Sequence, residues 1–268
     1  MNKNKYKAIF FDLDGTLLPM DMDLFLKHYF GLIGKFAAKK GFDAKKFMDA
    51  LLAGTGAMTQ GYPAAEDDVL PFEGAGKLNQ NTSQAFSQKK VVNSDRFWTV
   101  FSSHMGISKE EAEPIFMEFY TNDFCQLGLS VEPNPLAGKI VEVLKEKGYT
   151  LYLTTMPLFP EVAVIERLAW AKVNAGAFDR ITTFDNSTST KPYIDYYQEN
   201  IECSGFNPAE ILMVGNNTRE DLACLETGMD AYLVTDWMLN PNDFDINQVK
   251  HGSMEEFYEF VCSLPECE

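Results

Sequence analysis

The stretch Asp12-Leu13-Asp14-Gly15-Thr16 decides how the rest of the chain is interpreted, because it brings two carboxylates together at the end of a predicted strand. It follows residues 6–11, an apolar run rich in aromatic side chains that is typical of a buried β-strand. Side chains two residues apart share one face of a strand, so Asp12 and Asp14 are expected to lie side by side at its C-terminal end. Open α/β sheets bind their ligands at that edge, so a functional role is favoured over a simple polar turn.

The composition excludes several classes of protein. The chain has 268 residues and a net charge of −16, which argues against nucleic acid or an anionic membrane as a partner. Its five cysteines are scattered without C-x-x-C spacing, which argues against a disulfide framework or a zinc site. The basic, then apolar, N-terminus resembles a signal peptide, but Asp12 and Asp14 interrupt the apolar run. We therefore expect a soluble, cytoplasmic protein without a membrane-spanning segment.

The chain has two successive kinds of secondary-structure pattern. Residues 21–122 are mainly helical in pattern, with Ser108 and Glu111 forming a predicted capping box at one helix start. Within them, residues 53–92 are rich in Gly, Ala, Gln and Asn and are predicted to be a long loop-like excursion from the helical pattern.

From residue 131 onward, strands and helices alternate, as in a parallel sheet flanked by helices. The first strand has no neighbour near it in sequence, so it is expected to join that later sheet. The prediction is an α/β fold: a Rossmann-like parallel core of residues 1–19 and 133–268, with an inserted, mainly helical cap of residues 20–132. The expected elements after residue 131 are helices 135–148, 160–172, 191–203 and 219–227 and strands 150–154, 180–184, 210–214 and 231–234.

Three further segments gain meaning from the acidic pair. A predicted strand ends at Thr154-Thr155, and Lys191 stands at a loop-to-helix junction before Pro192, which is expected in the first helical turn. Residues 211–221 read as a strand, a glycine turn and an acidic helix start. Each segment is ordinary alone. Their order of acid pair, hydroxyl, lysine and carboxylate, each at the edge of a strand or helix, favours a shared functional site.

In that order the segments resemble the four motifs of the haloacid dehalogenase superfamily: D-x-D-G-T, a strand-end Ser or Thr, a Lys, and G-D with a second Asp. Residues 155–160, T-M-P-L-F-P, resemble the T-N-P-x-x-P form of the second motif, which favours Thr155 over Thr154. The resemblance, in agreement with the residue types, implies that Asp12 attacks phosphorus and Asp14 serves as general acid and base. Thr155 and Lys191 would bind the phosphoryl oxygens.

The resemblance also implies Mg²⁺ as cofactor, held by Asp12, the backbone carbonyl of Asp14, Asn216 and Asp221. The fourth motif departs from the family pattern because Asn216, an uncharged amide, stands where the pattern has Asp. We therefore expect weaker metal binding than in a G-D version of the site.

These observations predict a Mg²⁺-dependent phosphatase of a small phosphorylated metabolite. Asp14 argues against a dehalogenase, because displacement of a halide leaves no oxygen to protonate. Two alternatives remain open: a phosphomutase with the same chemistry, and a phosphate-binding or regulatory protein that has kept the fold and lost turnover, which Asn216 and Asn217 favour. His28, on the first predicted cap helix, could face the site but is expected to be an ordinary helix residue. The oligomeric state and the substrate are not predicted.

Overall fold

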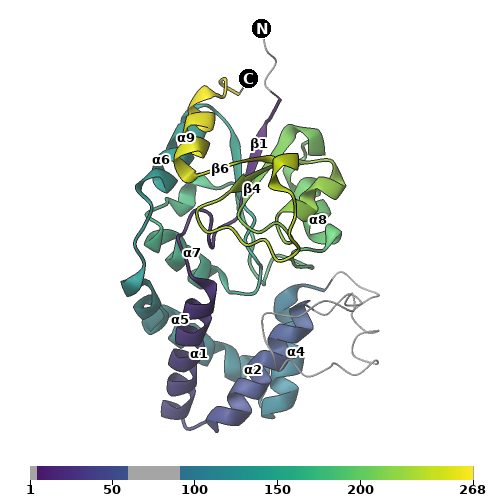
Figure 1. Ribbon diagram of the computed structural model, residues 1–268. Coiled ribbons are helices and arrows are strands. Elements are labelled where there is room, and N and C mark those ends of the chain that lie inside the picture. The colour runs from purple at the N-terminus through teal and green to yellow at the C-terminus, as the bar shows by residue number, and fades with distance from the viewer. Residues whose placement is uncertain (1–4, 60–90, 268) are drawn as a thin grey trace.

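The computed structural model describes residues 5–59 and 91–267. Its centre is a six-stranded sheet in the order β3-β2-β1-β4-β5-β6, and every neighbouring pair is parallel (Figure 1). The α/β fold with a parallel core and helical cap is therefore confirmed. The strands are β1 (Ala8–Phe11), β2 (Thr150–Leu153), β3 (Arg180–Ile181), β4 (Ile211–Gly215), β5 (Asp230–Val234) and β6 (Lys250–Gly252).

The first strand lies between two strands that are far from it in sequence. Phe11, its last residue, is in register with Leu153 of β2 and Val214 of β4. The chain continues this pairing beyond the strand, since the Asp12 amide donates to the Val214 carbonyl at 2.8 Å. The ends of three motif-bearing segments thus meet at one edge of the sheet.

Both faces of β1 are buried, which explains its continuous apolar sequence. Ile9 and Phe11 pack in the apolar cluster that includes α6 (Pro135–Glu146), α7 (Glu161–Trp170) and α9 (Met254–Ser263). Ala8 and Phe10 pack on the other face, in the cluster of α8 (Ile194–Ser204) and η4 (Leu222–Thr227).

The cap lies beyond the C-terminal edge of the sheet (Figure 1). Aromatic side chains form its interior, where the Phe47 ring contacts those of Phe101 and Phe116. The predicted capping box of Ser108 and Glu111 is confirmed. The cap elements are α1 (Met22–Lys39), α2 (Ala44–Thr59), α4 (Asn93–Met105), α5 (Lys109–Asn122) and η1 (Phe124–Ser130).

Several predicted elements differ in extent. Helix α2 continues to Thr59, so the excursion predicted from residue 53 is wrong for residues 53–59; the part at 60–90 lies outside the described residues. Gly54 belongs in this helix because a Cβ there would lie 2.7 Å from Phe97 Cδ2, so glycine lets α2 approach α4 closely. Pro192 lies before α8 rather than in its first turn, since the N-cap residue is Tyr193.

The C-terminal half departs from prediction in two other ways. The predicted helix at 219–227 is a 3-10 helix that begins only at Leu222, and β6 and α9 were not predicted. The predicted domain boundaries at residues 19/20 and 132/133 stay a prediction; the chain enters α1 at Met22 and returns to the core helices at Pro135. None of the helices in the described part of the chain has the length and apolar character to cross a bilayer.

Candidate functional site

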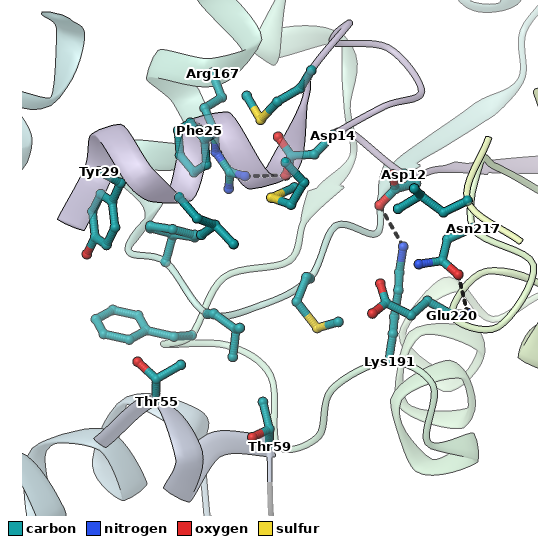
Figure 2. A pocket seen from close by; sticks show the side chains of 18 of the residues that line it. Asp12, Asp14, Phe25, Tyr29, Thr55, Thr59, Arg167, Lys191, Asn217 and Glu220 are labelled. Carbon is teal, nitrogen blue, oxygen red and sulfur yellow. Dashed lines mark hydrogen bonds and ion pairs between the residues drawn. The ribbon is translucent and has the colours of Figure 1, made fainter. Parts of the chain in front are cut away.

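A cavity of about 1130 Å³ lies between the C-terminal edge of the sheet and the cap. Asp12, Asp14, Lys191, Asn216 and Asp221, all expected site residues, are part of its lining. Figure 2 shows Asp12 and Lys191 on one side of this space and cap side chains on the other. The cavity therefore brings the first, third and fourth motifs to one surface.

Lys191 is shared between two carboxylates. Its Nζ atom donates to Asp12 Oδ1 at 2.7 Å and to Asp221 Oδ1 at 2.6 Å, and its side chain is only 1% exposed. Burial lowers the pKa of Lys191, but attraction to Asp12 and Asp221 outweighs burial and raises it, so the lysine is a cation. Burial raises the pKa of Asp12, and the charge of Lys191 opposes that rise.

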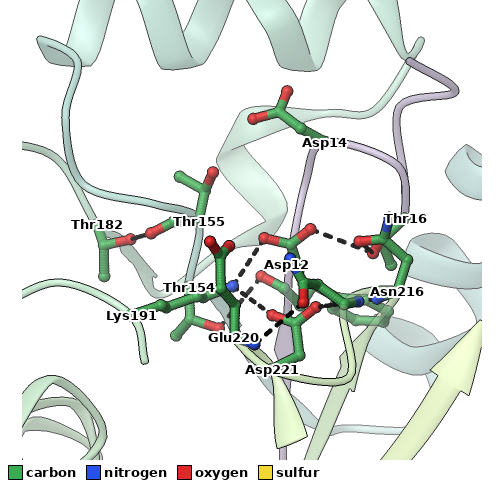
Figure 3. Close-up of polar contacts among 12 residues, drawn as sticks. Asp12, Asp14, Thr16, Thr154, Thr155, Thr182, Lys191, Asn216, Glu220 and Asp221 are labelled. Carbon is green, nitrogen blue, oxygen red and sulfur yellow. Dashed lines mark hydrogen bonds and ion pairs between the residues drawn. The ribbon is translucent and has the colours of Figure 1, made fainter. Parts of the chain in front are cut away.

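Asp221 holds the fourth-motif loop in place. Its Oδ2 atom accepts from the backbone amides of Asn216 and Asn217, both at 2.9 Å (Figure 3). A Cβ atom on Gly215 would lie 2.2 Å from Asp221 Cγ, so this carboxylate can fold back over the strand end only because residue 215 is glycine. Both carboxylate oxygens are thus engaged with protein donors.

Asn216 turns its amide oxygen toward Asp12. Its Nδ2 atom donates to the Trp237 carbonyl at 2.6 Å, which fixes the orientation of the amide. The Thr16 hydroxyl lies 3.3 Å from Asn216 Oδ1 and 3.2 Å from Asp12 Oδ2. Gly15, with φ +86°, passes so close that a Cβ there would lie 2.1 Å from Asn216 Nδ2. Two oxygen acceptors therefore converge on one hydroxyl proton.

Asp14 forms a buried ion pair with Arg167 of α7 (Figure 2). The two side chains are 9% and 2% exposed, and the guanidinium also lies 4.7 Å from the centre of the Phe159 ring. Asp14 Oδ1 and Arg167 Nη2 are buried without a hydrogen-bond partner among the described residues. Asp14 therefore faces the same cavity as Asp12 but has a different cation as its partner.

Sequence reasoning missed Arg167. The signal available was a charged residue on the apolar face of a helix, four residues after Ala163 and next to Leu168, both of which are buried. A buried cation requires an anionic partner, but nothing in the sequence identifies Asp14, 153 positions away, as that partner.

The two threonines at the end of β2 have different environments. The Thr154 hydroxyl donates to the Phe11 carbonyl at 3.2 Å and so has a structural partner. The Thr155 hydroxyl is buried with no partner among the described residues, although Thr155 is not part of the cavity lining. Its backbone carbonyl is fixed by the hydroxyls of Thr182 and Tyr196, at 3.0 and 2.8 Å. Thr155 is thus the threonine with an unused hydroxyl.

Glu220 is a further acid of the site that was not predicted as a site residue. It lines the cavity, and Figure 2 shows its carboxylate beside Lys191. Burial, with repulsion from Asp221, raises the pKa of Glu220 to about 7. Its position directly before Asp221 was the available signal. His28 is exposed and does not line the cavity, so it is an ordinary helix residue.

The chain matches the family model described as haloacid dehalogenase-like hydrolase over residues 6–226. No curated protein matches it at a significant level. Among solved structures it resembles an HAD phosphatase from Thermococcus onnurineus, with 17% identity, a TM-score of 0.52, and coverage of 97% of this chain and 99% of that chain. It also resembles an L-2-haloacid dehalogenase, with 15% identity, a TM-score of 0.52, and coverage of 97% and 100%.

These structural likenesses have low sequence identity and concern the fold, in which both a phosphatase and a dehalogenase are found. The family match covers most of the chain, including the four segments that meet at the sheet edge. The chain therefore belongs to the haloacid dehalogenase-like hydrolases.

Proposed function

We propose that this hydrolase cleaves phosphate monoesters through an aspartyl-phosphate formed on Asp12. One observation carries the proposal: two carboxylates, Asp12 and Asp14, face a single cavity while the buried cation Lys191 contacts Asp12. A nucleophile, a separate acid–base group and a fixed positive charge are the parts that this chemistry needs.

In the first step, an Asp12 carboxylate oxygen attacks phosphorus in line with the ester oxygen. The bond between phosphorus and the ester oxygen breaks, and Asp14, which takes up a proton from solvent when the substrate binds, gives that proton to the leaving oxygen. In the second step, water attacks the phosphorus of the aspartyl-phosphate, Asp14 takes the proton of that water, and the Asp12 oxygen leaves. The two steps release one alcohol and one phosphate and restore both carboxyl groups.

The positive charge of Lys191 supports the phosphoryl group as its charge develops. The Thr155 hydroxyl has no partner among the described residues, but it lies outside the cavity lining, so no contact with the phosphoryl group is assigned to it. Arg167 acts on Asp14 rather than on the substrate's phosphorus, because its guanidinium pairs with that carboxylate. We assign Arg167 as a positioning residue that fixes the Asp14 carboxylate at the cavity wall until the ester oxygen arrives.

The donor set near Asp12 fits a hard divalent cation such as Mg²⁺. Asp12 Oδ2 and Asn216 Oδ1 converge on one Thr16 hydroxyl, which has a single proton to offer, so one oxygen is left without a donor. Asp12, Asn216 and the Asp14 carbonyl would hold the ion, which when bound would neutralise charge on the phosphoryl oxygens. Asp221 would support it through the loop, since both its oxygens already accept protein donors.

Within residues 5–59 and 91–267, no three or more His, Cys, Asp or Glu side chains gather as a metal site, which fits the presence of the Asn216 amide. Asn216 contributes an oxygen but no charge to the ion, so weak metal binding is part of the proposal.

Asp14 favours phosphate esters over haloacids, although one structural neighbour is a dehalogenase. A halide leaves without needing a proton, whereas an alkoxide leaving group does need one. We further propose a phosphorylated metabolite, rather than nucleic acid or a membrane, as the substrate of a cytoplasmic enzyme. The net charge of −16 supports this, because it repels polyanionic surfaces.

The test is a direct comparison of two reaction classes. Phosphate release from 4-nitrophenyl phosphate and halide release from 2-chloropropionate are measured with and without Mg²⁺. We expect Mg²⁺-dependent phosphate release and no halide release. Halide release without phosphate release would overturn the proposal. Binding of inorganic phosphate with turnover of neither substrate would favour the phosphate-binding alternative.

A further inference from the structure

The cavity has two chemically different ends. The sheet end carries the charged groups of the proposed reaction, among them Asp12, Lys191 and Glu220. The cap end is apolar and largely aromatic (Figure 2). Its wall is formed by Phe25, Tyr29 and Phe30 of α1, Leu51 of α2, Phe97 and Trp98 of α4, Phe116 and Tyr120 of α5, and Leu158 and Phe159 of the core.

The hydroxyl groups in this wall are already used within the protein. Those of Tyr29 and Tyr120 lie 2.9 Å apart and bond to each other. The Thr55 hydroxyl donates to the Leu51 carbonyl at 2.9 Å, and the Thr59 hydroxyl donates to the Gly56 carbonyl at 3.2 Å. The wall therefore presents carbon surface to a ligand, even where its residues are nominally polar.

The described cap residues place no basic side chain in the cavity wall. Among the described residues, the cap side chains that line the cavity include the acids Asp21, Asp23 and Glu113 but no Lys, Arg or His. Asp21 and Asp23 are exposed at the start of α1. A second phosphate or a carboxylate on the substrate would be repelled by these acids and would meet no basic partner among the described cap residues of the wall.

The size of the cavity exceeds what a phosphate group needs. At about 1130 Å³ it is slightly larger than the range that holds drug-sized ligands, roughly 300–1,000 Å³.

From these observations we infer that the alcohol esterified to the phosphate is largely apolar, of the size of a substituted bicyclic ring, and carries no second anionic group. The inference rests on the proposed function for the phosphate end. Transfer of that apolar group from water into the cap would favour such esters over small polar ones.

Primary alkyl phosphates provide the test, because their leaving groups have similar acidity and differ mainly in what the cap must hold. We compare 2-(1-naphthyl)ethyl phosphate with glycerol 3-phosphate, phosphoethanolamine and 3-phosphoglycerate. We expect kcat/KM for the naphthyl ester to exceed that of each other ester by roughly a hundredfold, the order of magnitude that burial of a bicyclic ring supports.

A cavity-filling variant tests whether the preference for the naphthyl ester arises from the cap wall. Thr55→Trp places an indole in the cap wall, and Leu24→Trp adds the same group to an exposed position of α1 that does not line the cavity. We expect Thr55→Trp to lower kcat/KM for the naphthyl ester at least tenfold and to change that for glycerol 3-phosphate less than twofold. Leu24→Trp is expected to change neither.

Equal or better turnover of a small polar or anionic ester would overturn the inference and leave the phosphatase proposal intact. An equal effect of Thr55→Trp on both esters would also overturn it. Calorimetry with 1-naphthylmethylphosphonate and methylphosphonate separates the two proposals. Tighter binding of the naphthyl compound without turnover of any ester would support the apolar site and contradict the phosphatase, whereas equal binding would contradict the apolar site.

Discussion

Asn216 is the residue at which the chain departs from its family's motif, and its contacts predict what a carboxylate there would do. Asn216→Asp adds a negative charge next to Asp12 and removes the amide group that donates to the Trp237 carbonyl. We expect the Mg²⁺ concentration for half-maximal turnover to fall by roughly tenfold, since hard cations depend on ligand charge. Without metal, we expect the variant to have a lower free energy of unfolding, because a carboxylate oxygen of residue 216 would then face the Trp237 carbonyl oxygen with no proton between them.

A Mg²⁺ titration of turnover and a thermal melt without metal measure the two effects. Asn217→Asp is the matched control: the Asn217 side chain accepts from the Arg219 and Glu220 amides at 3.0 and 3.2 Å, so it has a structural role. A larger gain in Mg²⁺ affinity at residue 217 than at residue 216 would contradict the assignment of Asn216.

Arg167 and Asp14 form a buried ion pair, so we expect their substitutions to have non-additive effects on the free energy of unfolding. Arg167→Met leaves Asp14 as a buried charge without its cation, which costs roughly 3–5 kcal/mol of unfolding free energy. Asp14→Leu combined with Arg167→Met removes both charges, and we expect the double variant to be more stable than Arg167→Met alone. Urea unfolding measures both. Additive losses would show that the two side chains do not stabilise each other.

At the residue scale, local patterns predicted more than long-range ones. Asp12 was predicted from the acid pair at the end of a strand pattern, and Lys191 was predicted from its place in the order of the four motif segments. The structure brings them together at 2.7 Å. The pairing of Asp14 with Arg167 depends on how α7 packs against the loop that follows β1. The local sequence of neither segment predicts this packing.

At the element scale, the contact between α2 and α4 depends on one glycine. Gly54→Ala would place Cβ 2.7 Å from Phe97 Cδ2 and 3.2 Å from the Phe97 carbonyl oxygen, so the helices must move apart. We expect a loss of about 1–3 kcal/mol in the free energy of unfolding.

Gly31→Ala is the matched control in α1, where a new Cβ meets nothing within 4 Å. Alanine is the better helix former, so that variant should gain up to about 1 kcal/mol. Thermal unfolding of both variants gives the comparison. A stable Gly54→Ala protein would mean that the two helices are not held at this distance.

Asp230 ties the start of β5 to neighbouring segments. Burial raises the pKa of Asp230, but hydrogen bonds from Lys5, Tyr6 and Lys250 outweigh burial and lower it to about 2. The folded pKa is thus below the unfolded one. The carboxylate therefore contributes stability above the ordinary aspartate pKa of about 3.9, and this contribution is lost as the pH falls toward 2.

We expect Asp230→Asn to lower the free energy of unfolding by about 1 kcal/mol at pH 7, because the partially exposed lysines are screened by solvent. The difference from the parent should shrink below pH 4. Urea unfolding at several pH values measures it. A difference that stays constant down to pH 2 would contradict the role of the ionised carboxylate.

Element boundaries were predicted less well than element types. β3 is only Arg180–Ile181 although residues 180–184 were predicted, because the chain leaves the sheet edge after two residues. The predicted α2 ended too early because its Gly54 and Gly56 are typical of loops, whereas a Cβ at Gly54 would collide with Phe97 of α4. β6 has one buried residue of three, so its sequence lacks the apolar pattern of a strand.

At the scale of the whole molecule, one apolar cluster runs from the sheet into the cap and includes Phe11, Phe25 and Phe119. The cavity lies within this continuous packing, so the phosphate end and the apolar end are bordered by the same apolar cluster. The alternation of strands and helices predicted the core, and the insertion after β1 predicted the cap. The way in which the cap packs on the sheet follows from side-chain contacts that no local pattern encodes.

The central claim, an aspartyl-phosphate on Asp12, is tested most directly by trapping it. The protein is mixed with 4-nitrophenyl phosphate and Mg²⁺, quenched in acid, and its peptides are weighed by mass spectrometry. Asp14→Asn should accumulate the intermediate, since 4-nitrophenolate leaves without a proton but the second step lacks its base. We predict one phosphoryl group on the peptide that contains Asp12, more in Asp14→Asn and none in Asp12→Asn. Steady turnover with no phosphorylated peptide, or with the label on another residue, would contradict it.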